Sequence, residues 1–232
     1  MNSQRKMFSP RVLVPMLLIV VVVPFLPLLI SRRWDWWEAW VYGVLAVLGF
    51  AISRALAARR HPDLLVERSR FMQSEDAKPW DKRLAPLVGL GSGLIPIVAG
   101  LDELFGWSPP SILPVKIAAL VVILVGYVLA SYALIENRFF SGMVRIQTDR
   151  GHQVVSGGPY RWVRHPGYAG GLLTYLATPL FLDAAWALIP AVLLTIVLVV
   201  RTSLEDRTLQ AELPGYADFA ARTRYRLLPG IW

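Results

Sequence analysis

The feature that most constrains this chain is a series of apolar segments, several of them close to 20 residues long. About 20 apolar residues in a helix cross the hydrocarbon core of a bilayer. The chain is therefore predicted to be an all-α, polytopic integral membrane protein, in which the tight turn Leu182-Asp183-Ala184 joins the last two helices into a hairpin. The six predicted transmembrane segments are residues 12–30, 37–56, 84–101, 115–135, 169–182 and 184–200.

The composition agrees with a membrane protein and excludes several kinds of site. Of 232 residues, 55% are hydrophobic and 17% are charged, whereas soluble domains have about 25% charged residues. The chain has no cysteine, which excludes disulfides, thiol nucleophiles, iron–sulfur clusters and cysteine-based zinc sites. The three histidines, His61, His152 and His165, leave little for a metal site, and we expect none.

The distribution of basic residues predicts the orientation in the membrane. With the N-terminus in the cytoplasm and six spans, 21 of the 24 lysines and arginines lie on the cytoplasmic side, and both termini do too. Arg32, Arg33 and Lys116 are the exceptions. This is a strong positive-inside pattern. The net charge of +8 is thus explained by topology and by attraction to anionic lipids, and we expect no nucleic-acid partner.

The polar chemistry is concentrated in three predicted cytoplasmic pieces, residues 57–83, 136–168 and 202–232. The densest part, residues 151–168, is rich in glycine and proline, which favours a loop with fixed turns. It runs directly into the segment 169–182, whose 14 residues make a helix of about 21 Å. The loop is therefore expected to lie at or below the lipid headgroups, where polar residues often mark function. The alternative is interfacial anchoring by its aromatic and basic residues.

A second polar motif, Glu205-Asp206, lies one turn beyond Arg201 at the cytoplasmic end of the last predicted span. Adjacent residues on a helix point in different directions. We therefore expect at most one of the two acids to point at the loop, and the other to be solvated.

These motifs carry a resemblance to a known family. The loop block is followed by the apolar hairpin, by Glu205-Asp206, and by Leu227-Leu228-Pro229-Gly230. This arrangement resembles the isoprenylcysteine carboxyl methyltransferase family, which belongs to a wider group of membrane methyltransferases that includes phospholipid N-methyltransferases. The resemblance is tight over residues 136–232, and the upstream segments 60–65 and 78–81 resemble the bacterial branch, which implies a bacterial inner membrane. The loop block is Gly158-Pro159-Tyr160-Arg161-Trp162-Val163-Arg164-His165-Pro166-Gly167-Tyr168.

The resemblance implies a methyltransferase that uses S-adenosylmethionine without a Rossmann fold and takes a lipophilic acceptor, such as the carboxylate of an isoprenylcysteine, from the membrane. The family would place Asn137 in the active site, where capping of the preceding helix is the alternative, and Arg222 beside the acceptor, with Arg224 or Arg226 as alternatives. Asp206 stands at the position of the family's second glutamate and is one methylene shorter. The implied cofactor shell is His152, Gln153, Val154, Val155, Tyr160, Arg164, His165, Tyr168, Glu205 and Asp206.

We divide the chain into N-terminal transmembrane helices, residues 1–101 with the loop 57–83, and a methyltransferase core, residues 112–232. A carboxylate acceptor suits the arginine-rich tail and needs no general base. An amine acceptor, as in a phospholipid N-methyltransferase, would need one. Sterol-reductase-like enzymes that use NADPH usually carry Arg-x-Pro-Asn-Tyr, whereas this chain has His165-Pro166-Gly167-Tyr168. A non-enzymatic membrane scaffold is the third alternative.

Two further motifs are expected to be structural. His61-Pro62 is interpreted as a helix terminus. The glycines of Gly89-x-Gly91-x-Gly93 lie inside an apolar segment with no preceding strand, so they are interpreted as close helix packing and not as a nucleotide-binding loop.

Overall fold

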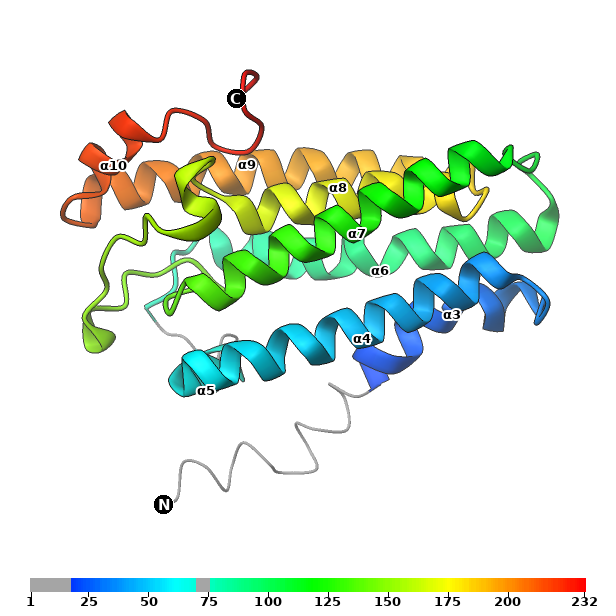
Figure 1. Ribbon diagram of the computed structural model, residues 1–232, viewed down its shortest axis with the longest axis horizontal. Helices are drawn as coiled ribbons and strands as arrows, with labels where there is room; N and C mark the ends of the chain where they lie inside the picture. The colour runs from blue at the N-terminus through cyan, green and yellow to red at the C-terminus, as the bar shows by residue number, and fades with distance from the viewer. Residues whose placement is uncertain (1–17, 70–75) are drawn as a thin grey trace, which may run out of the picture.

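The computed structural model describes residues 18–69 and 76–232, and within these ranges the chain is helical with no strand (Figure 1). Short 3-10 turns lie at Thr148–Arg150, Gly158–Arg161 and Ala185–Ala187, and a π-helical turn at Leu18–Val22 precedes the first α-helix. The α-helices are α3 (Val23–Ser31), α4 (Trp37–Arg60), α5 (Pro62–Ser69), α6 (Asp81–Phe105), α7 (Leu113–Glu136), α8 (Pro166–Phe181), α9 (Leu188–Glu212) and α10 (Tyr216–Arg222).

Within the described residues, four helical segments are long and apolar enough to cross a membrane. They are α4, α6, α7 and the segment Ala185–Glu212, which contains α9. The structure therefore confirms an all-helical polytopic membrane protein in the described residues. The other two predicted spans differ: residues 12–17 lie outside the described residues and leave a shorter apolar helix, Ile19–Ser31, while α8 has only 16 residues.

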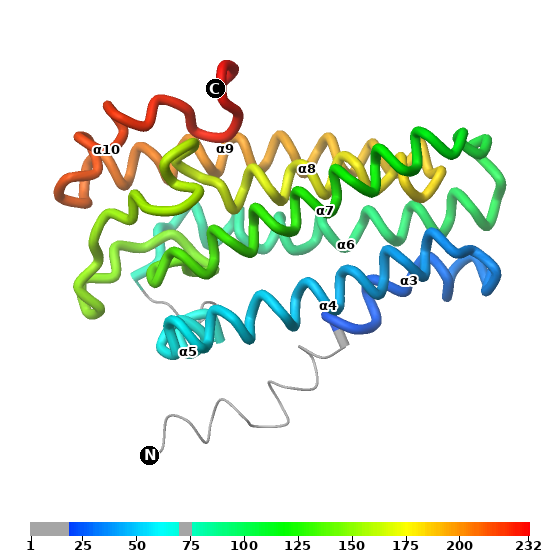
Figure 2. The backbone as a smooth tube through the Cα atoms, viewed as in Figure 1, coloured from blue at the N-terminus to red at the C-terminus, as the bar shows by residue number. Residues whose placement is uncertain are grey.

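The long helices run side by side along one axis, so that one end of the bundle carries the polar loops (Figure 2). Helix α8 packs most extensively against α7 and also contacts α9, and α9 packs against α6. The short helix α3 packs against α6 and α4 at the end away from the loops. The loop between α7 and α8, together with α5 and α10, covers the other end.

The close packing of α7 and α8 depends on two glycines that face each other. A Cβ atom on Gly170 would lie 2.5 Å from the carbonyl oxygen of Gly126, and one on Gly126 would lie 2.6 Å from the carbonyl oxygen of Gly170. Small residues of this kind let membrane helices approach backbone to backbone. In the predicted glycine motif of α6, Gly91 contacts Leu194, whereas Gly89 and Gly93 would meet nothing within 4 Å.

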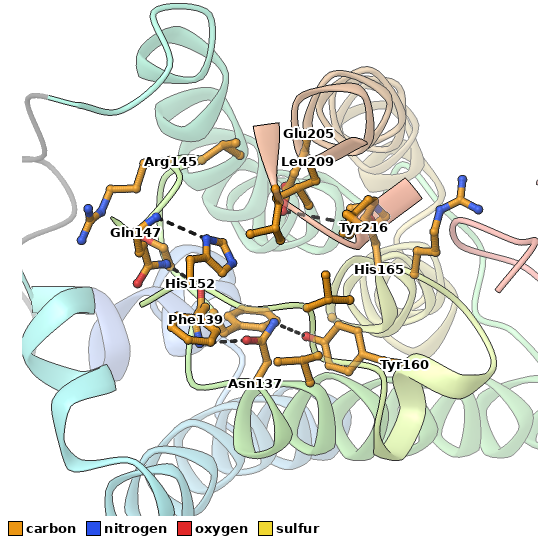
Figure 3. Close-up of a pocket in the computed structure, with 18 of the residues that line it drawn as sticks. Asn137, Phe139, Arg145, Gln147, His152, Tyr160, His165, Glu205, Leu209 and Tyr216 are labelled. Carbon is orange, nitrogen blue, oxygen red and sulfur yellow. Dashed lines mark hydrogen bonds and ion pairs between the residues drawn. The ribbon is translucent and has the colours of Figure 1, made fainter. Parts of the chain in front are cut away.

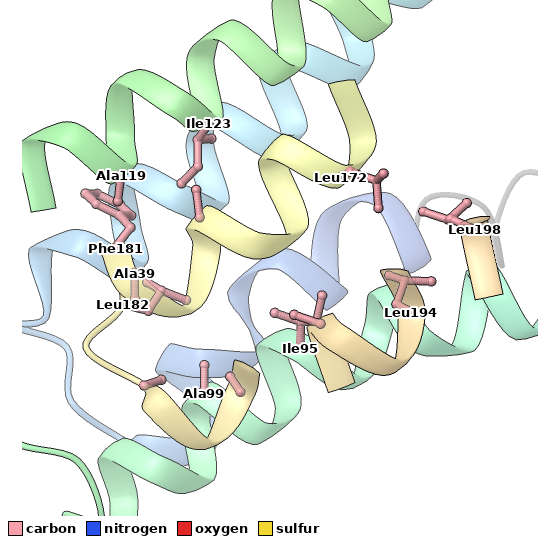
Figure 4. Packing of buried hydrophobic residues seen from close by; sticks show 14 of the residues in the cluster. Ala39, Ile95, Ala99, Ala119, Ile123, Leu172, Phe181, Leu182, Leu194 and Leu198 are labelled. Atoms are coloured by element: carbon pink, nitrogen blue, oxygen red, sulfur yellow. The ribbon is translucent and has the colours of Figure 1, made fainter. Parts of the chain in front are cut away.

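The bundle interior is filled by side chains from α6, α7, α8 and α9, as Figure 4 shows. Phe181, Ile95 and Ile123 are almost completely buried there. Large apolar side chains also project outward from the same helices and from α4, which is expected where lipid replaces water as the solvent.

At the end of the bundle away from the loops, buried acids tie the connections between helices together. Lys116 forms ion pairs with Glu38 and with Asp183, whose Oδ2 lies 2.5 Å from Nζ. Asp183 also accepts a hydrogen bond from the backbone N–H of Ser111 at 2.8 Å. The turn between α8 and α9 is thereby joined to the start of α7.

The two classes of glycine predict opposite responses to the same substitution. Gly170→Ala should destabilise the protein by about 1–3 kcal/mol, because backbone atoms that cannot move aside occupy the space of the new methyl group. Gly93→Ala should be neutral or slightly stabilising, since alanine favours a helix by about 1 kcal/mol over glycine and the methyl group meets open space. Thermal unfolding in detergent measures both. Equal melting temperatures for the two variants would contradict the close approach of α7 and α8.

Candidate active site

A pocket lies at the polar end of the bundle, between the loop that precedes α8, the C-terminal end of α9 and helix α10 (Figure 3). The pocket and its mouth enclose about 780 Å³ of space. Aromatic side chains and a few polar groups share its walls, which is typical of ligand sites. The predicted site residues that line it are Asn137, His152, Gln153, Val154, Val155, Tyr160, Arg164, His165, Tyr168 and Glu205.

Asn137 holds the start of the loop where α7 ends. Its side-chain oxygen accepts a hydrogen bond from the backbone N–H of Phe139 at 2.8 Å. Its amide nitrogen donates to the hydroxyl of Tyr160 at 3.0 Å. The two sequence interpretations of Asn137, helix capping and a place in the site, are therefore compatible, because the residue caps α7 and lines the pocket.

Tyr160 is buried at the top of a turn that requires glycine. Gly158 adopts a φ of +53°, in the left-handed region that favours glycine. Burial raises the pKa of the Tyr160 phenol, and the negative charges of Glu205 and Glu136 raise it further, although the hydrogen bond from Asn137 opposes this. Tyr160 therefore stays a neutral phenol and presents its ring to the pocket.

The loop block is paired with the C-terminal tail by backbone hydrogen bonds. The N–H of Arg164 donates to the carbonyl of Tyr225, and the N–H of His165 donates to the carbonyl of Arg226, both at 2.9 Å. Pro166 then begins α8, a position that suits proline because the first helical N–H groups have no partner within the helix. The tail thus fixes where α8 begins.

The side chain of Asp206 is completely buried beneath the pocket and does not line it. Arg164 binds it with a fork, Nε to Oδ1 at 2.7 Å and NH2 to Oδ2 at 3.0 Å. Arg226, Gln210 and Tyr216 also donate to it, at 2.9, 2.8 and 3.1 Å. The expectation that at most one of the two acids points at the loop is therefore wrong, because Asp206 binds Arg164 of the loop and Glu205 lines the pocket that the loop forms. Asp206 joins the loop, α9, α10 and the tail.

Arg164 lines the pocket, yet its guanidinium is occupied by the protein. Besides the fork on Asp206, its NH1 donates to the carbonyl oxygens of Thr223 at 2.8 Å and Arg224 at 2.9 Å. Arg164 therefore holds the wall of the pocket together and has little donor capacity left for a ligand.

Glu205 is the acid that faces the pocket. Its side chain is 21% exposed, compared with 0% for Asp206. The hydroxyl of Tyr168 donates to Oε2 at 2.7 Å, while Oε1 lies 4.0 Å from Nδ1 of His165. The His165 ring stacks on Tyr168 and its other nitrogen lies 3.4 Å from Asp206, so it stands between the two acids. The site thus presents one accessible carboxylate beside aromatic rings.

His152 is held as a neutral ring. Its Nδ1 accepts a hydrogen bond from the backbone N–H of Gln147 at 3.2 Å, and the ring lies against Phe139 with 4.6 Å between centroids. Burial lowers the pKa of His152 to about 4, and the positive charges of Arg145 and Arg150 lower it further. At neutral pH this histidine contributes a flat, uncharged wall.

Several residues that shape the pocket were not predicted from the sequence. Arg145 binds Glu67 of α5 with a fork at 2.9 Å and also pairs with Asp76 and Asp149. Gln147 is buried and donates to the carbonyl of Phe139 at 2.7 Å. These contacts fix the loop to the segment that precedes α6. The only signal of this in the sequence was the large number of charged residues in the segment 57–83.

A second unpredicted pair, Arg201 and Asp81, forms a buried fork at 2.7 and 2.9 Å between α9 and the start of α6. Arg201 lines the pocket and its guanidinium lies 5.4 Å above the ring of Tyr168. Asp81 also accepts the backbone N–H of Val144 at 2.6 Å. This pair therefore aligns the loop, α6 and α9.

The predicted acceptor-side arginine, Arg222, is exposed in the last turn of α10 and does not line the pocket. Its Nε donates to the carbonyl of Asp218 at 3.3 Å, within its own helix. Arg224 is also exposed, and Arg226 is bound to Asp206. The arginines that do reach the pocket are Arg145, Arg164 and Arg201.

Comparisons with known proteins find a similarity between the region of the loop and hairpin and one family. Residues 116–211 match the model of the isoprenylcysteine carboxyl methyltransferase (ICMT) family. These residues are therefore similar to that family and are called the ICMT region below. The match covers α8, most of α7 and nearly all of α9, and so includes every predicted cofactor residue.

Two curated relatives agree with this ICMT region. Both are named probable protein-S-isoprenylcysteine O-methyltransferase, one from Oryza sativa subsp. indica and one from Oryza sativa subsp. japonica. Each is 33% identical over 69 residues, which are 29% of this chain and 36% of the relative. The matched part thus spans about a third of the length of these relatives.

The two acids of the ICMT region should differ in what they do. Asp206→Asn should lower the free energy of unfolding by about 3–5 kcal/mol, because it leaves the buried guanidinium of Arg164 without its countercharge. Glu205→Gln should change stability much less, since its carboxylate is partly exposed. Thermal unfolding of both variants in the same detergent measures the difference. A larger loss for Glu205→Gln than for Asp206→Asn would contradict the arrangement described.

His152 predicts a pH dependence of stability. Its pKa is about 4 in the folded protein and about 6.5 when unfolded. As the pH falls from 6.5 to 4 the unfolded chain therefore binds a proton that the folded protein does not, and stability is lost across this window. His152→Gln removes this proton linkage. The melting temperature of the wild type should therefore fall more steeply than that of the variant between pH 6.5 and 4.5, and parallel curves would refute the prediction.

Proposed function

We propose that this protein is a membrane methyltransferase that uses S-adenosylmethionine and methylates the carboxylate of a lipophilic acceptor of the isoprenylcysteine type. The observation that carries the proposal is the pocket in the ICMT region, where the accessible carboxylate of Glu205 lies beside the aromatic rings of Tyr168 and Tyr160. The family match and the named relatives support the reaction class.

The chemistry of the pocket fits S-adenosylmethionine. The cofactor carries an ammonium group and a sulfonium cation, which are stabilised by a carboxylate and by aromatic faces. We assign Glu205 to the ammonium group, the rings of Tyr160 and Tyr168 to the cationic part, and His165 and Gln153 to its polar groups. His152, which is neutral, adds no positive charge against this ligand.

When bound, S-adenosylmethionine supplies an electrophilic methyl group on its sulfonium. A carboxylate acceptor is already a nucleophile at neutral pH, so the protein has to align it and exclude water, and no general base is needed. Arg222 lies outside the pocket and is not assigned to the acceptor. Arg201 lines the pocket, is held in one orientation by Asp81, and supplies positive charge near an anionic acceptor.

We also propose the orientation that the charge pattern predicts, with six spans and both termini in the cytoplasm of a bacterial inner membrane. The pocket is at the end of the bundle that carries the loop 136–168 and the tail, which are the arginine-rich pieces. The pocket would then open toward the cytosol, where S-adenosylmethionine is found, while the acceptor would come from the bilayer.

The test is binding of S-adenosylmethionine to the detergent-purified protein by calorimetry, with NADPH as the comparison. The wild type should bind the methyl donor saturably and should not bind NADPH. Glu205→Gln and His165→Ala should each weaken binding at least tenfold, because they remove the accessible carboxylate and the ring that holds it.

The matched control is Arg222→Ala, which changes a charged residue outside the pocket and should leave the affinity for S-adenosylmethionine within twofold. Melting temperatures establish that each variant is folded. Normal affinity in both Glu205→Gln and His165→Ala would refute the site assignment, and binding of NADPH alone would favour a reductase.

A further inference from the structure

Two partly buried arginines beside the pocket have no acidic partner. Arg54 lies near the end of α4 and Arg68 lies in α5. Within residues 18–69 and 76–232, neither has a carboxylate within 4.0 Å, whereas the buried arginines Arg145, Arg164 and Arg201 each form a short ion pair. A guanidinium removed from water without a countercharge is unfavourable, so an anionic ligand bound to these arginines would be stabilised.

Arg68 is directed at the wall of the pocket. Its NH1 donates to the carbonyl oxygen of Phe140 at 3.0 Å, and its guanidinium carbon lies 5.4 Å from the centre of the Phe140 ring. Phe140 itself lines the pocket. The single bond to a carbonyl leaves most of the five N–H donors of Arg68 without a protein partner among the described residues.

The electrostatic surroundings of Arg68 are positive. Burial lowers the pKa of Arg68 to about 10, and the charge of Arg201 contributes to this lowering, although Tyr168 opposes it. The two acids of α5 are already bound: Glu67 by Arg145, and Asp63 by Arg138 and Arg150. The charge of Arg68 also acts on Arg54, so the two cations repel one another.

Arg54 lies on α4 close enough to Arg68 for their charges to interact. Its guanidinium lies 4.5 Å from the ring of Phe50 and donates to the hydroxyl of Ser53 at 3.1 Å. Ala57, one turn further along the same side of α4, is completely buried. Arg54 therefore lies on a side of α4 that packs against the protein, and it adds positive charge there.

We propose that Arg68, supported by Arg54, forms an anion-binding site for the carboxylate of the lipophilic methyl acceptor. The inference rests on the proposed function. Arg54 adds its positive charge to this region, and Arg68 holds the anionic head beside Phe140 at the wall of the cofactor pocket. A phosphate on a membrane lipid has the same chemistry as a ligand. We favour the acceptor over the lipid phosphate because Arg68 contacts Phe140 in the pocket wall. Arg68 is also close enough to Arg201 and Tyr168, which line the pocket, to interact with them electrostatically.

The experiment measures binding of N-acetyl-S-farnesylcysteine and of its uncharged carboxamide to the full chain in phosphatidylcholine nanodiscs, by calorimetry. The wild type should prefer the carboxylate at least tenfold. Arg68→Gln should reduce that preference to within about twofold, Arg68→Lys should retain part of it, and Arg54→Gln should give a smaller loss. The matched control is Arg59→Gln, which changes an exposed arginine at the same end of α4 that has no ion pair with any described residue, and it should leave the preference unchanged.

The outcomes separate the two sources of the anion and the two proposals. Unchanged carboxylate preference in both Arg68 variants would overturn the inference, and the Lys variant keeps the test valid if Arg68→Gln does not fold. Nanodiscs with phosphatidylglycerol, analysed by native mass spectrometry, test the lipid: loss of bound phosphatidylglycerol in Arg68→Gln without loss of carboxylate preference would assign the site to lipid. Failure of the wild type to bind S-adenosylmethionine would refute the proposed function. Binding of S-adenosylmethionine is measured separately from the preference for the carboxylate, so the two proposals can fail independently.

Discussion

The geometry of the pocket depends on one buried carboxylate. Burying the charge of Asp206 is costly unless it is fully hydrogen-bonded, and the protein meets this cost with donors from the loop, from α9, from α10 and from the tail. Because each donor belongs to a different element, none of these elements can move away without exposing an unpaired charge. Glu205, one residue earlier, is thereby held at the pocket wall and stays free to bind a ligand.

Much of the fold could be predicted from local sequence signals. Apolar runs of about 20 residues predicted α4, α6, α7 and α9, because length and hydropathy decide whether a helix can span a bilayer. The loop residues of the site followed from the glycine and proline pattern together with the family resemblance. The divergence of Glu205 and Asp206 followed from the 100° between adjacent helical residues, although the burial of Asp206 did not.

The residues that were missed depend on contacts between distant parts of the chain. Asp81 and Arg201 are far apart in sequence, and Arg145 meets acids from α5. Nothing local distinguishes these charges from solvated ones such as Arg222. Only the folded arrangement of α5, α6 and α9 shows which arginines are enclosed and which are exposed, and so the role of Arg222 could not be settled by motif spacing.

The contacts that α5 and the start of α6 make with the loop limit how the matched region could be transferred to another protein. Glu67 and Asp81 lie upstream of residues 116–211, the part that matches the family, yet they hold the backbone and side chains that form the pocket. Residues 116–211 would therefore not form the same pocket without the helices that precede them. A chimera that grafts these residues onto unrelated membrane helices would have to recreate these two acidic anchors, whereas the lipid-facing residues of α4 could be exchanged freely.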